Sequence, residues 1–500
     1  NNYKKAEKRG NLIKTDEMIA KAKTEYYGFL REEFGGLKAT LDKMPMKVTA
    51  NFSGGSTAAD PEVKKIFKEL LGDHLANVLR DESDPWGTNG GLADSSRDDK
   101  KALAHPKADI IEYSRQHPDE IIFNFDLDAD RISIVLNGEL YLGGDMFLPV
   151  VEYQLTLAPD KEYYKEMFID SRMKATLTDA IKHFGGIVKK HPKGHSKVKA
   201  SMDVALEAMA KKEGLTVEEF LKAHPKFRML QPEFSLHMFS SNKYGASIDD
   251  AVRFAFIWLE IFSAIKEKYN KPNWTLPEYM QYLEDQSIIK PVSQVKEQRT
   301  PIKDAAKVPV MKRMTAKVQD YFARHPDLKY EFYPRWQDFN GSSADYVFVD
   351  VDGVYDLTTP MGHVFWGWSN TSGKIAYGVQ ADTVEKTRKL LEIVISLLVE
   401  SRQEVAEEMD VPLESISPVE TGASQHLLNI KSEDLPKFEI ELHNKYPGDK
   451  LFEALTASSD MKKDDLSEKV VKAFNQNADY PGTLKSTSRI ENLNNKDFMN

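Results

Sequence analysis

The chain has 500 residues, of which 41% are hydrophobic and 29% charged, a balance typical of folded globular proteins and not of disordered or fibrous ones. Its 68 Lys and Arg stand against 78 Asp and Glu, and the resulting net charge of −10 disfavours nucleic-acid binding, because phosphate contacts need clustered cations. Cysteine is absent, which excludes disulfides, Cys-ligated zinc, iron–sulfur clusters and thiol nucleophiles.

Membrane insertion and secretion are also disfavoured. The most apolar helical stretch, residues 390–399, is too short to span a bilayer and contains Glu392. No apolar run follows the N-terminus, so we expect no signal peptide and a cytoplasmic location. The first residue is Asn1 and not Met, which we interpret as the start of a fragment of a longer protein. The length suggests about three or four domains.

The first predicted elements alternate between strands and helices. Residues 46–50 form a strand, followed by a turn of small residues at 53–56. Asp60-Pro61 predicts the start of a helix, because Asp caps N-termini and Pro fits the first helical position. The apolar residues of this helix share one face and Gly72 ends it. Further strands at 121–125 and 132–136 complete an α/β domain predicted to span residues 1–158.

A second unit is predicted over residues 159–290. It contains a strand at 168–169, a helix at 177–184, a capping box at Thr216–Glu219 and a long apolar helix at 248–268. The stretch 270–301 is rich in Pro and polar residues and predicts a linker with a short helix.

A third unit is predicted over residues 291–404, with a partly ordered extension over 405–500. Its expected elements are strands at 346–349, 364–366 and 375–379, a turn at Asp352-Gly353, and a helix that begins at Thr383.

The most informative local sequence is Asp126-Leu127-Asp128-Ala129-Asp130-Arg131, which lies between two predicted strands. Three carboxylates at alternate positions of a tight turn can converge on one point, and a hard divalent cation would remove their repulsion. An EF-hand is excluded because its sixth position needs Gly and its twelfth needs Glu, whereas this chain has Arg131 and Asn137. A solvated acidic turn is the alternative to a metal site.

This acidic sequence resembles the metal loop of the α-D-phosphohexomutases, the phosphomannomutase/phosphoglucomutase family. Other segments resemble that family in the same order along the chain, and the resemblance covers about residues 1–402. They are Pro45-Met46-Lys47-Val48 with its glycine turn, Gly194-His195-Ser196, the sugar-loop-like Glu233-Phe234-Ser235-Leu236-His237, and the phosphate-loop-like Ser369-Asn370-Thr371-Ser372.

The resemblance implies a fold and an activity. It implies two consecutive three-layer α/β/α domains (1–158 and 159–290), an α+β, TBP-like domain (291–404) and the extension (405–500). The implied activity is Mg²⁺-dependent intramolecular phosphoryl transfer on hexose phosphates in carbohydrate metabolism, by way of a phosphoserine. Such transfer depends mostly on positioning and on neutralising charge.

The resemblance also assigns candidate roles. Asp126, Asp128 and Asp130 would bind Mg²⁺. The implied substrate-binding residues are Glu233, Ser235, His237, Ser369, Asn370 and Thr371, and the implied catalytic residues are His195, Arg172 (where the family often has lysine) and Arg131. Taken singly, Glu233 could equally be a surface carboxylate, His195 a solvated loop histidine, and Ser369-Asn370-Thr371 a generic turn.

Several departures from the family pattern argue against full activity. The family's phosphoserine sequence Thr-Ala-Ser-His-Asn-Pro does not occur, so we expect the domain that carries it to be absent. Gly367 stands where the phosphate loop has arginine, and Leu127 and Leu236 replace glycines of the metal and sugar loops. We therefore expect hexose phosphate binding to be weak or lost and the chain to be inactive alone.

Three interpretations remain open on the sequence. The first is a phosphohexomutase-like protein. The second is a catalytically inactive binding or structural protein on the same scaffold, with residues 405–500 as the surface for a protein partner. The third, an unrelated α/β protein, would require several ordered motifs to agree by coincidence.

Overall fold

The structure is a computed structural model that divides into two compact units. The first unit combines Asn1–Tyr164 with Ala210–Gln281, and the second combines Lys165–Met209 with Tyr282–Asn500. The structure describes residues 15–84, 104–105, 108–170, 172–173, 175–191, 195–234, 236–241, 247–290, 292–324, 331–333, 354–359, 362–368 and 374–416.

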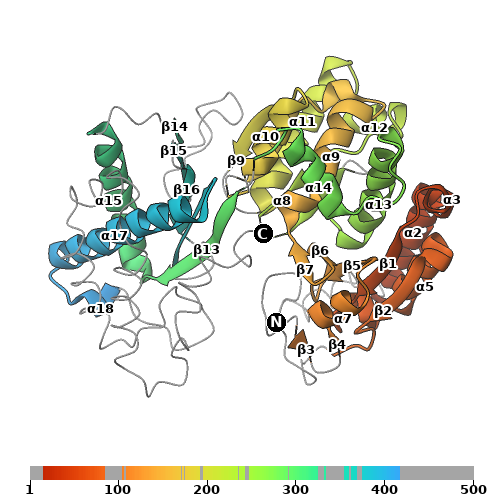
Figure 1. The fold of residues 1–500 in the computed structure, drawn as a ribbon, viewed down its shortest axis with the longest axis horizontal. Helices are drawn as coiled ribbons and strands as arrows, with labels where there is room; N and C mark the ends of the chain where they lie inside the picture. The colour runs from red at the N-terminus through yellow and green to blue at the C-terminus, as the bar shows by residue number, and fades with distance from the viewer. Residues whose placement is uncertain are drawn as a thin grey trace, which may run out of the picture. The chain divides into compact units, whose positions relative to one another are not determined.

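A mixed five-stranded sheet forms the centre of the first unit (Figure 1). Its order is β2 (Leu75–Leu79), β1 (Lys47–Asn51), β5 (Glu120–Phe125), β6 (Ile132–Leu136) and β7 (Glu139–Tyr141). Strand β1 is parallel to β2 and β5, whereas β6 is antiparallel to β5 and β7. Asn137 and Gly138 have φ of 50° and 78° and make the tight turn between β6 and β7.

Helices cover both faces of this sheet. On one face, the Phe67 ring of α5 (Pro61–Leu71) lies 6.0 Å from that of Phe125, and Phe123 lies 5.9 Å from Trp258 of α13 (Ala251–Lys268). On the other face, Ile122 packs with Ile110 of α7 (Ile110–Gln116). Successive residues of β5 therefore point to opposite faces, and both faces are apolar because both are covered.

The remaining elements of the first unit are helices and short strands. They are α2 (Thr15–Phe34), α3 (Leu37–Lys43), α4 (Ser56–Ala59), η1 (Gly72–His74), β3 (Ala104–His105), β4 (Ala108–Asp109), α8 (Gly143–Met146), α9 (Leu148–Glu152), η2 (Tyr153–Leu157), η3 (Lys161–Tyr163), α12 (Val217–Ala223), β10 (Leu230–Pro232), β11 (Met238–Ser241) and β12 (Ser247–Asp249). Two further helices belong to both units by sequence, α11 (His195–Lys212) and α14 (Leu276–Asp285). Strands β10, β11 and β12 form an antiparallel sheet.

The second unit contains two sheets. Strands β8 (Glu166–Asp170) and β9 (Ile187–His191) are parallel, and α10 (Ala175–His183) lies between them in the chain. The other sheet is antiparallel, with the order β13 (Ser293–Pro301), β17 (Lys374–Ala381), β16 (Gly362–Trp368), β15 (Val354–Thr359) and β14 (Glu331–Tyr333). Helices α15 (Asp304–Ala323) and α17 (Val384–Glu408) share a core with it, and the short α18 (Leu413–Ile416) follows.

Predictions that depended on local signals are confirmed. The Asp60 side chain accepts from the backbone N–H of Glu62 at the start of α5, and Gly72, with φ 57°, ends that helix. The capping box at Thr216 and Glu219 is present at the start of α12. These signals succeed because each is satisfied by atoms within a few residues. The mixed α/β fold class is also confirmed, while the three-layer and TBP-like descriptions stay predictions.

Two expectations are corrected by contacts between distant segments. The long apolar helix begins at Ala251 and not at residue 248, because Ile248 pairs with Ser240 between β12 and β11 and Asp250 caps the helix by accepting from the Arg253 N–H. The short helix expected within 270–301 is present as α14, but the stretch is not a linker, because it ends in β13, which pairs with β17. The strand expected at 346–349 and the turn at 352–353 lie outside the described residues.

The four-part domain division remains a prediction. Helix α17 runs through its last boundary, at residues 404 and 405, and ends at Glu408. Most of the predicted extension, residues 417–500, lies outside the described part of the chain.

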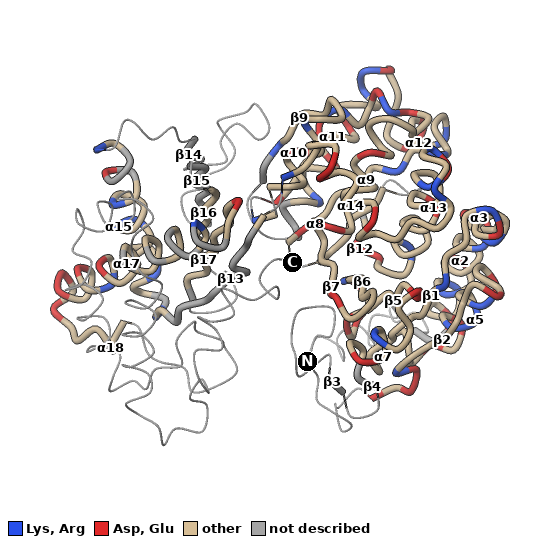
Figure 2. Tube along the Cα trace, viewed as in Figure 1, with Lys and Arg blue, Asp and Glu red and all other residues tan. Residues whose placement is uncertain are grey.

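Charges on the described elements are mixed in sign. Figure 2 shows acidic and basic positions interspersed along helices such as α2 and α5, with neither sign gathered on one of them. None of the described helices is both long and apolar enough to cross a bilayer.

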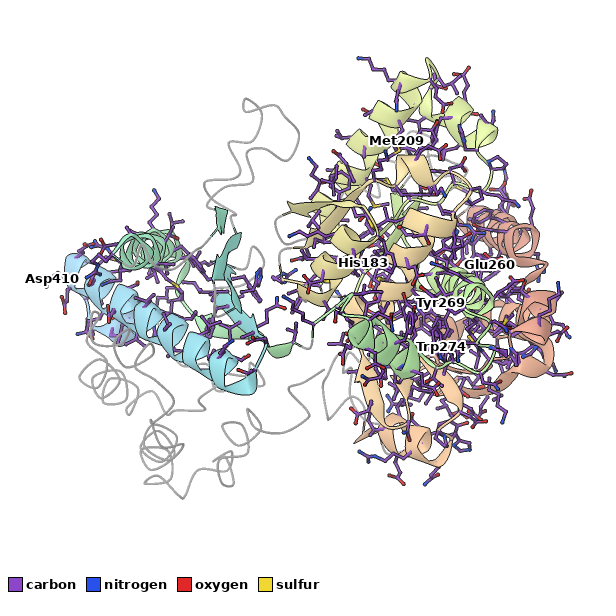
Figure 3. All side chains as sticks on the ribbon, turned by 45° about the horizontal axis from the view of Figure 1, so that its top comes forward. His183, Met209, Glu260, Tyr269, Trp274 and Asp410 are labelled. Atoms are coloured by element: carbon purple, nitrogen blue, oxygen red, sulfur yellow. The ribbon has the colours of Figure 1, made fainter. Side chains whose placement is uncertain are left out.

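Helix α13 is buried along most of its length and anchors the first unit. In Figure 3, where Glu260 and Tyr269 mark its course, side chains fill the space around it. Its Trp258 indole N–H donates to the Met146 carbonyl at 2.8 Å. Near its end, Lys268 and Tyr269 both donate to the fully buried Glu152.

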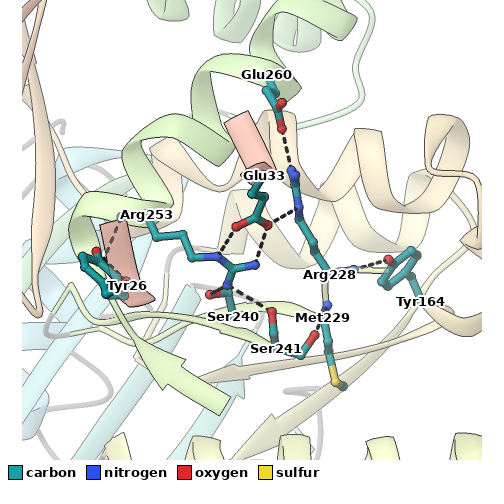
Figure 4. A network of polar contacts seen from close by, with 10 residues as sticks. Tyr26, Glu33, Tyr164, Arg228, Met229, Ser240, Ser241, Arg253 and Glu260 are labelled. Carbon is teal, nitrogen blue, oxygen red and sulfur yellow. Dashed lines mark hydrogen bonds and ion pairs between the residues drawn. The ribbon is translucent and has the colours of Figure 1, made fainter. Parts of the chain in front are cut away.

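A chain of alternating charges joins α13 to α2 (Figure 4). Glu33 of α2 accepts two hydrogen bonds from Arg253, at 2.8 and 2.7 Å, and lies 2.9 Å from Nε of Arg228. Arg228 also donates to Glu260 at 2.6 Å, and Arg253 donates to Ser240 and Ser241 of β11. The two guanidinium groups are balanced by two carboxylates, as partly buried charges require.

This network predicts a large effect for one substitution. Glu33→Ala would leave the buried Arg253 without its bidentate carboxylate and is expected to lower the free energy of unfolding by about 3–5 kcal/mol, measured by urea denaturation. The matched control is Glu25→Ala on the same helix, where the ion pair to Lys21 is exposed and 3.7 Å long. That change should cost at most about 1 kcal/mol. Equal losses for the two variants would contradict the importance of the network.

Candidate metal site

The loop between β5 and β6 brings the three predicted aspartates together. One carboxylate oxygen each from Asp126, Asp128 and Asp130 can be chosen so that all lie within 4.8 Å of one another. Asp126 is buried at 2% exposure, Asp130 is half-buried and Asp128 is exposed. The loop therefore has the convergent geometry expected from the sequence.

The loop closes on itself by hydrogen bonds at its two ends. The backbone N–H of Asp126 donates to the Arg131 carbonyl at 3.4 Å, and the backbone N–H of Arg131 donates to Oδ1 of Asp126 at 3.2 Å. Ala129, between them, adopts a φ of 61°, which turns the chain back. Its carbonyl accepts from the N–H of Ala251, the first residue of α13, at 3.2 Å.

The turn after β1 supports the same loop from the neighbouring strand. The N–H of Ser56 donates to the Leu127 carbonyl at 2.6 Å, and the Ser53 hydroxyl donates to the Phe125 carbonyl at 2.5 Å. A Cβ atom on Gly55 would lie only 2.2 Å from the Leu127 oxygen. Glycine is therefore needed at position 55 by close backbone approach, because a side chain would push the metal loop away.

Arg131 is the cation that offsets this acidic loop. Its Nη1 donates to Oδ2 of Asp126 at 3.1 Å, and its Nε lies 3.8 Å from Oδ1 of Asp130. That oxygen of Asp130 accepts no hydrogen bond among the described residues. Burial, followed by repulsion from Asp130, raises the pKa of Asp126 to about 8 in spite of Arg131. One guanidinium does not offset three carboxylates, and a divalent cation with oxygen ligands fits the remaining charge.

The predicted sugar loop lies directly beside the metal loop. Between β10 and β11, the N–H of Glu233 donates to the His237 carbonyl, and the N–H of Leu236 donates to the Glu233 carbonyl, both at 2.9 Å. The N–H of Ile132 in β6 donates to the Leu236 carbonyl at 3.2 Å, and Arg131 forms a β-bridge with His237. Backbone hydrogen bonds therefore fix the two loops against each other.

The backbone at Leu236 adopts a conformation that suits glycine better than leucine. Its φ is 78°, a left-handed conformation that disfavours a leucine, yet its side chain is buried. Burial of the apolar side chain offsets part of the backbone strain. Glu233 in the same loop is 1% exposed and so is not the surface carboxylate considered as its alternative. Ser235 lies outside the described residues.

His237 points toward a fourth carboxylate that sequence reasoning missed. Its ring is 3% exposed, and its Nδ1 lies 3.2 Å from Oδ2 of Asp249 and 3.5 Å from Oδ2 of Asp130. Arg131 Nε donates to the other ring nitrogen, Nε2, at 3.1 Å. The only signal for Asp249 in the sequence is the acidic pair Asp249-Asp250 before the apolar helix.

The other predicted site residues belong to the second unit of the chain or lie outside the described residues, so their role at this site stays a prediction. Arg172 is 5% exposed in the second unit, where its Nε and backbone N–H both donate to Oδ1 of Asp170 at 2.9 Å. His195 is the first residue of α11, and its side chain lies outside the described part of the structure. Ser369, Asn370 and Thr371 also lie outside the described residues. Gly367 is buried within β16, where it pairs with Val354 and Ala376.

The chain is similar to several solved structures. The chain is similar to pp63/parafusin, a phosphoglucomutase from Paramecium, with 14% identity and a TM-score of 0.51, over 77% of this chain and 62% of that one. It is also similar to a phosphoglucomutase/phosphomannomutase family protein from Burkholderia thailandensis, with 17% identity and a TM-score of 0.46, over 75% of this chain and 64% of that one.

A third similar structure was solved with ligands. It is the N-acetylphosphoglucosamine mutase of Aspergillus fumigatus in complex with GlcNAc-6P and magnesium, with 14% identity, a TM-score of 0.45, and coverage of 74% of this chain and 69% of that one. No protein-family model matches the sequence, and neither does any curated protein. The likeness to the Paramecium protein shows a shared fold, and the matched region spans less than two thirds of that protein's length.

The close approach of Gly55 to Leu127 predicts a site-specific loss of stability. Gly55→Ala would force apart the backbones of two loops and is expected to lower the free energy of unfolding by about 2 kcal/mol or more in urea denaturation. Gly28→Ala is the control, because nothing lies within 4 Å of its Cβ position in helix α2. That change should stabilise the protein by about 0.5–1 kcal/mol. A neutral result for Gly55→Ala would contradict the packing described above.

Proposed function

We propose that this chain is an α-D-phosphohexomutase-like protein of the phosphomannomutase/phosphoglucomutase type, with a Mg²⁺ site at Asp126, Asp128 and Asp130. The observation that carries the proposal is the convergence of these three carboxylates within 4.8 Å, in a loop bonded to the sugar-loop-like segment. The shared fold with the Paramecium phosphoglucomutase supports the same assignment.

Each described residue of the site has a physical task in this proposal. When bound, Mg²⁺ neutralises charge on the oxygens of a transferring phosphoryl group. Asp126 and Asp130 contribute ligand oxygens from a loop whose ends are closed by hydrogen bonds, so little ordering is needed on binding. Arg131 keeps the buried Asp126 oriented from within the protein by donating to its second oxygen.

The ligand proposed for the neighbouring loop is a hexose phosphate. Glu233 and Ser235 would contact sugar hydroxyls and Ser369, Asn370 and Thr371 the phosphate, by their resemblance to the family motifs. Position 367 is glycine, so no guanidinium is available there for a bidentate phosphate contact. Loss of such a charge-assisted pair removes about 2–3 kcal/mol of binding. Weak binding is therefore the expectation.

A catalytically inactive binding or structural protein on the same scaffold is the second candidate. The sequence contains no Ser-His-Asn-Pro segment that could supply a phosphoserine. Arg172, at the position of an active-site lysine, is held by the buried Asp170 in an ion pair. Both observations favour a chain that keeps the metal loop but does not turn over substrate by itself, with residues 405–500 as the proposed surface for a protein partner.

Metal binding is the first test of the proposal. Mg²⁺ is expected to raise the melting temperature of the wild-type chain. At a Mg²⁺ concentration one hundred times Kd, the free energy of unfolding should rise by about 2.7 kcal/mol. Asp128→Asn should abolish the gain without harming the fold, because Asp128 is exposed. Asp73→Asn removes the same charge from an exposed position before β2 and should leave the response intact. Identical melting curves with and without Mg²⁺ would count against the site.

Turnover and substrate affinity separate the two candidate functions. The chain alone should not convert glucose 1-phosphate to glucose 6-phosphate with Mg²⁺ and glucose 1,6-bisphosphate present, because it offers no phosphoserine. Titration calorimetry should give a Kd for glucose 6-phosphate or mannose 6-phosphate well above the low micromolar range. An active phosphoglucomutase assayed in parallel serves as the positive control. Measurable turnover, or low-micromolar affinity, would show that catalytic function is retained.

A further inference from the structure

Both ring nitrogens of His224, the residue that follows helix α12, form a hydrogen bond with a carboxylate. Nδ1 lies 3.0 Å from Oδ1 of Asp160, and Nε2 lies 3.2 Å from Oε2 of Glu213. A neutral imidazole has one N–H and one lone pair, so one of its nitrogens would direct a lone pair at a carboxylate oxygen. Only the imidazolium donates to both oxygens. The arrangement therefore calls for a charged His224.

Aromatic rings complete the surroundings of His224. The ring of Phe220, one turn earlier in α12, lies 4.5 Å from the imidazole, and that of Tyr163 lies 5.3 Å from it. The Tyr163 hydroxyl donates to the second oxygen of Glu213. Among the described residues, neither Asp160 nor Glu213 forms an ion pair with a lysine or an arginine. His224 is therefore the cation that balances these two carboxylates.

The three residues belong to segments that adjoin the crossings of the chain between its two units. The chain leaves the first unit after Tyr164, shortly beyond Asp160, and re-enters it at Ala210, shortly before Glu213. Asp160 and His224 are 64 residues apart in sequence. The ion pairs of His224 therefore join the end of α12 to both of these segments within the first unit.

We propose that His224 is a proton-dependent clamp that, when charged, fastens the end of α12 to the two segments where the chain leaves and re-enters the first unit. Loss of one ring proton would leave a lone pair facing a carboxylate, and that contact would open. None of the three residues belongs to the metal loop or to the sugar-loop-like segment, so the clamp does not depend on the proposed metal site.

The direction of the pH dependence follows from the pKa of His224. Burial of the ring disfavours its charge, but the hydrogen bonds to Asp160 and Glu213 outweigh burial and raise this pKa. The clamp therefore contributes its full stability below the ordinary histidine pKa of about 6.5 and loses it as the pH rises through the higher value of the folded chain. Helix α12 should be held firmly at mildly acidic pH and more loosely at alkaline pH.

The same three side chains are poorly arranged for a metal ion. The two nitrogens of an imidazole point away from each other, and Asp160 and Glu213 lie at different nitrogens. An ion bound at one nitrogen would therefore contact one carboxylate and not the other. The geometry favours a proton on each nitrogen over a shared metal ion.

An NMR titration of the histidine rings in the full chain tests the charge of His224. Its resonance is the one that Asp160→Asn and Glu213→Gln both shift and that His224→Gln removes. We expect a wild-type pKa above the ordinary value of about 6.5 and a lower pKa in each carboxylate variant. Asp42→Asn is the control, because Asp42 faces a different histidine, His74, at 3.0 Å. A wild-type pKa at or below 6.5, or one that neither carboxylate variant lowers, would overturn the proposal.

Hydrogen exchange tests whether the proton fastens α12. Between about pH 6 and pH 9, protection of its amides, corrected for intrinsic exchange, should fall about tenfold for each unit by which folding raises the pKa of His224. Helix α5, which contains no histidine, reports any general change in stability. The fall should be absent in His224→Gln, and an equal fall in this variant and in wild type would overturn the clamp.

A second variant keeps the exchange measurement decisive where His224→Gln fails to fold. Asp160→Asn removes one of the two negative charges at the ring and leaves the histidine in place. The fall in α12 protection with pH should be smaller in this variant than in wild type, in proportion to the drop in the pKa of His224. A fall as large as that of wild type, in spite of a lowered pKa, would contradict the clamp.

Discussion

Mutual repulsion among Asp126, Asp128 and Asp130 is the constraint around which the first unit is arranged. Their oxygens lie within 4.8 Å, and such an arrangement persists only where the surrounding structure holds it or a cation relieves it. Arg131 supplies one positive charge from the same loop. Gly55 and Ser56 hold the backbone of the loop from the neighbouring strand, so its shape does not depend on its own residues alone.

Helix α13, which is buried in the core, contacts this loop directly and helps to hold it in place. Its first residue donates to the Ala129 carbonyl, and its cap, Asp250, adjoins the Asp249 that faces His237. Arg253, one turn further on, is held by Glu33 of α2 and by Ser240 and Ser241 of β11. The helix therefore connects the metal loop, the strand after the sugar loop and α2 through contacts that are each short and mostly buried.

The sequence predicted helix caps and turns correctly, but it did not predict which distant segments pair as strands. The Asp60 cap, the Thr216 capping box and the Asn137-Gly138 turn are each satisfied by neighbours in the chain, and all three are present. Strand β13 was taken for a linker because its partner, β17, lies about eighty residues away in sequence. The start of α13 was placed too early for a related reason, since Ile248 is apolar but belongs to a strand pair.

For the candidate site, the sequence by itself determined the acidic loop, its likeness to a metal loop and the order of the motifs that follow it. Carboxylates at alternate positions of one turn must lie close together, so their convergence was a local property. Only the tertiary structure placed His237 against Arg131, 106 residues away in sequence, and Asp249 against His237. Those contacts depend on the packing of β10, β11 and β12 beside the metal loop, which no pattern within a single segment encodes.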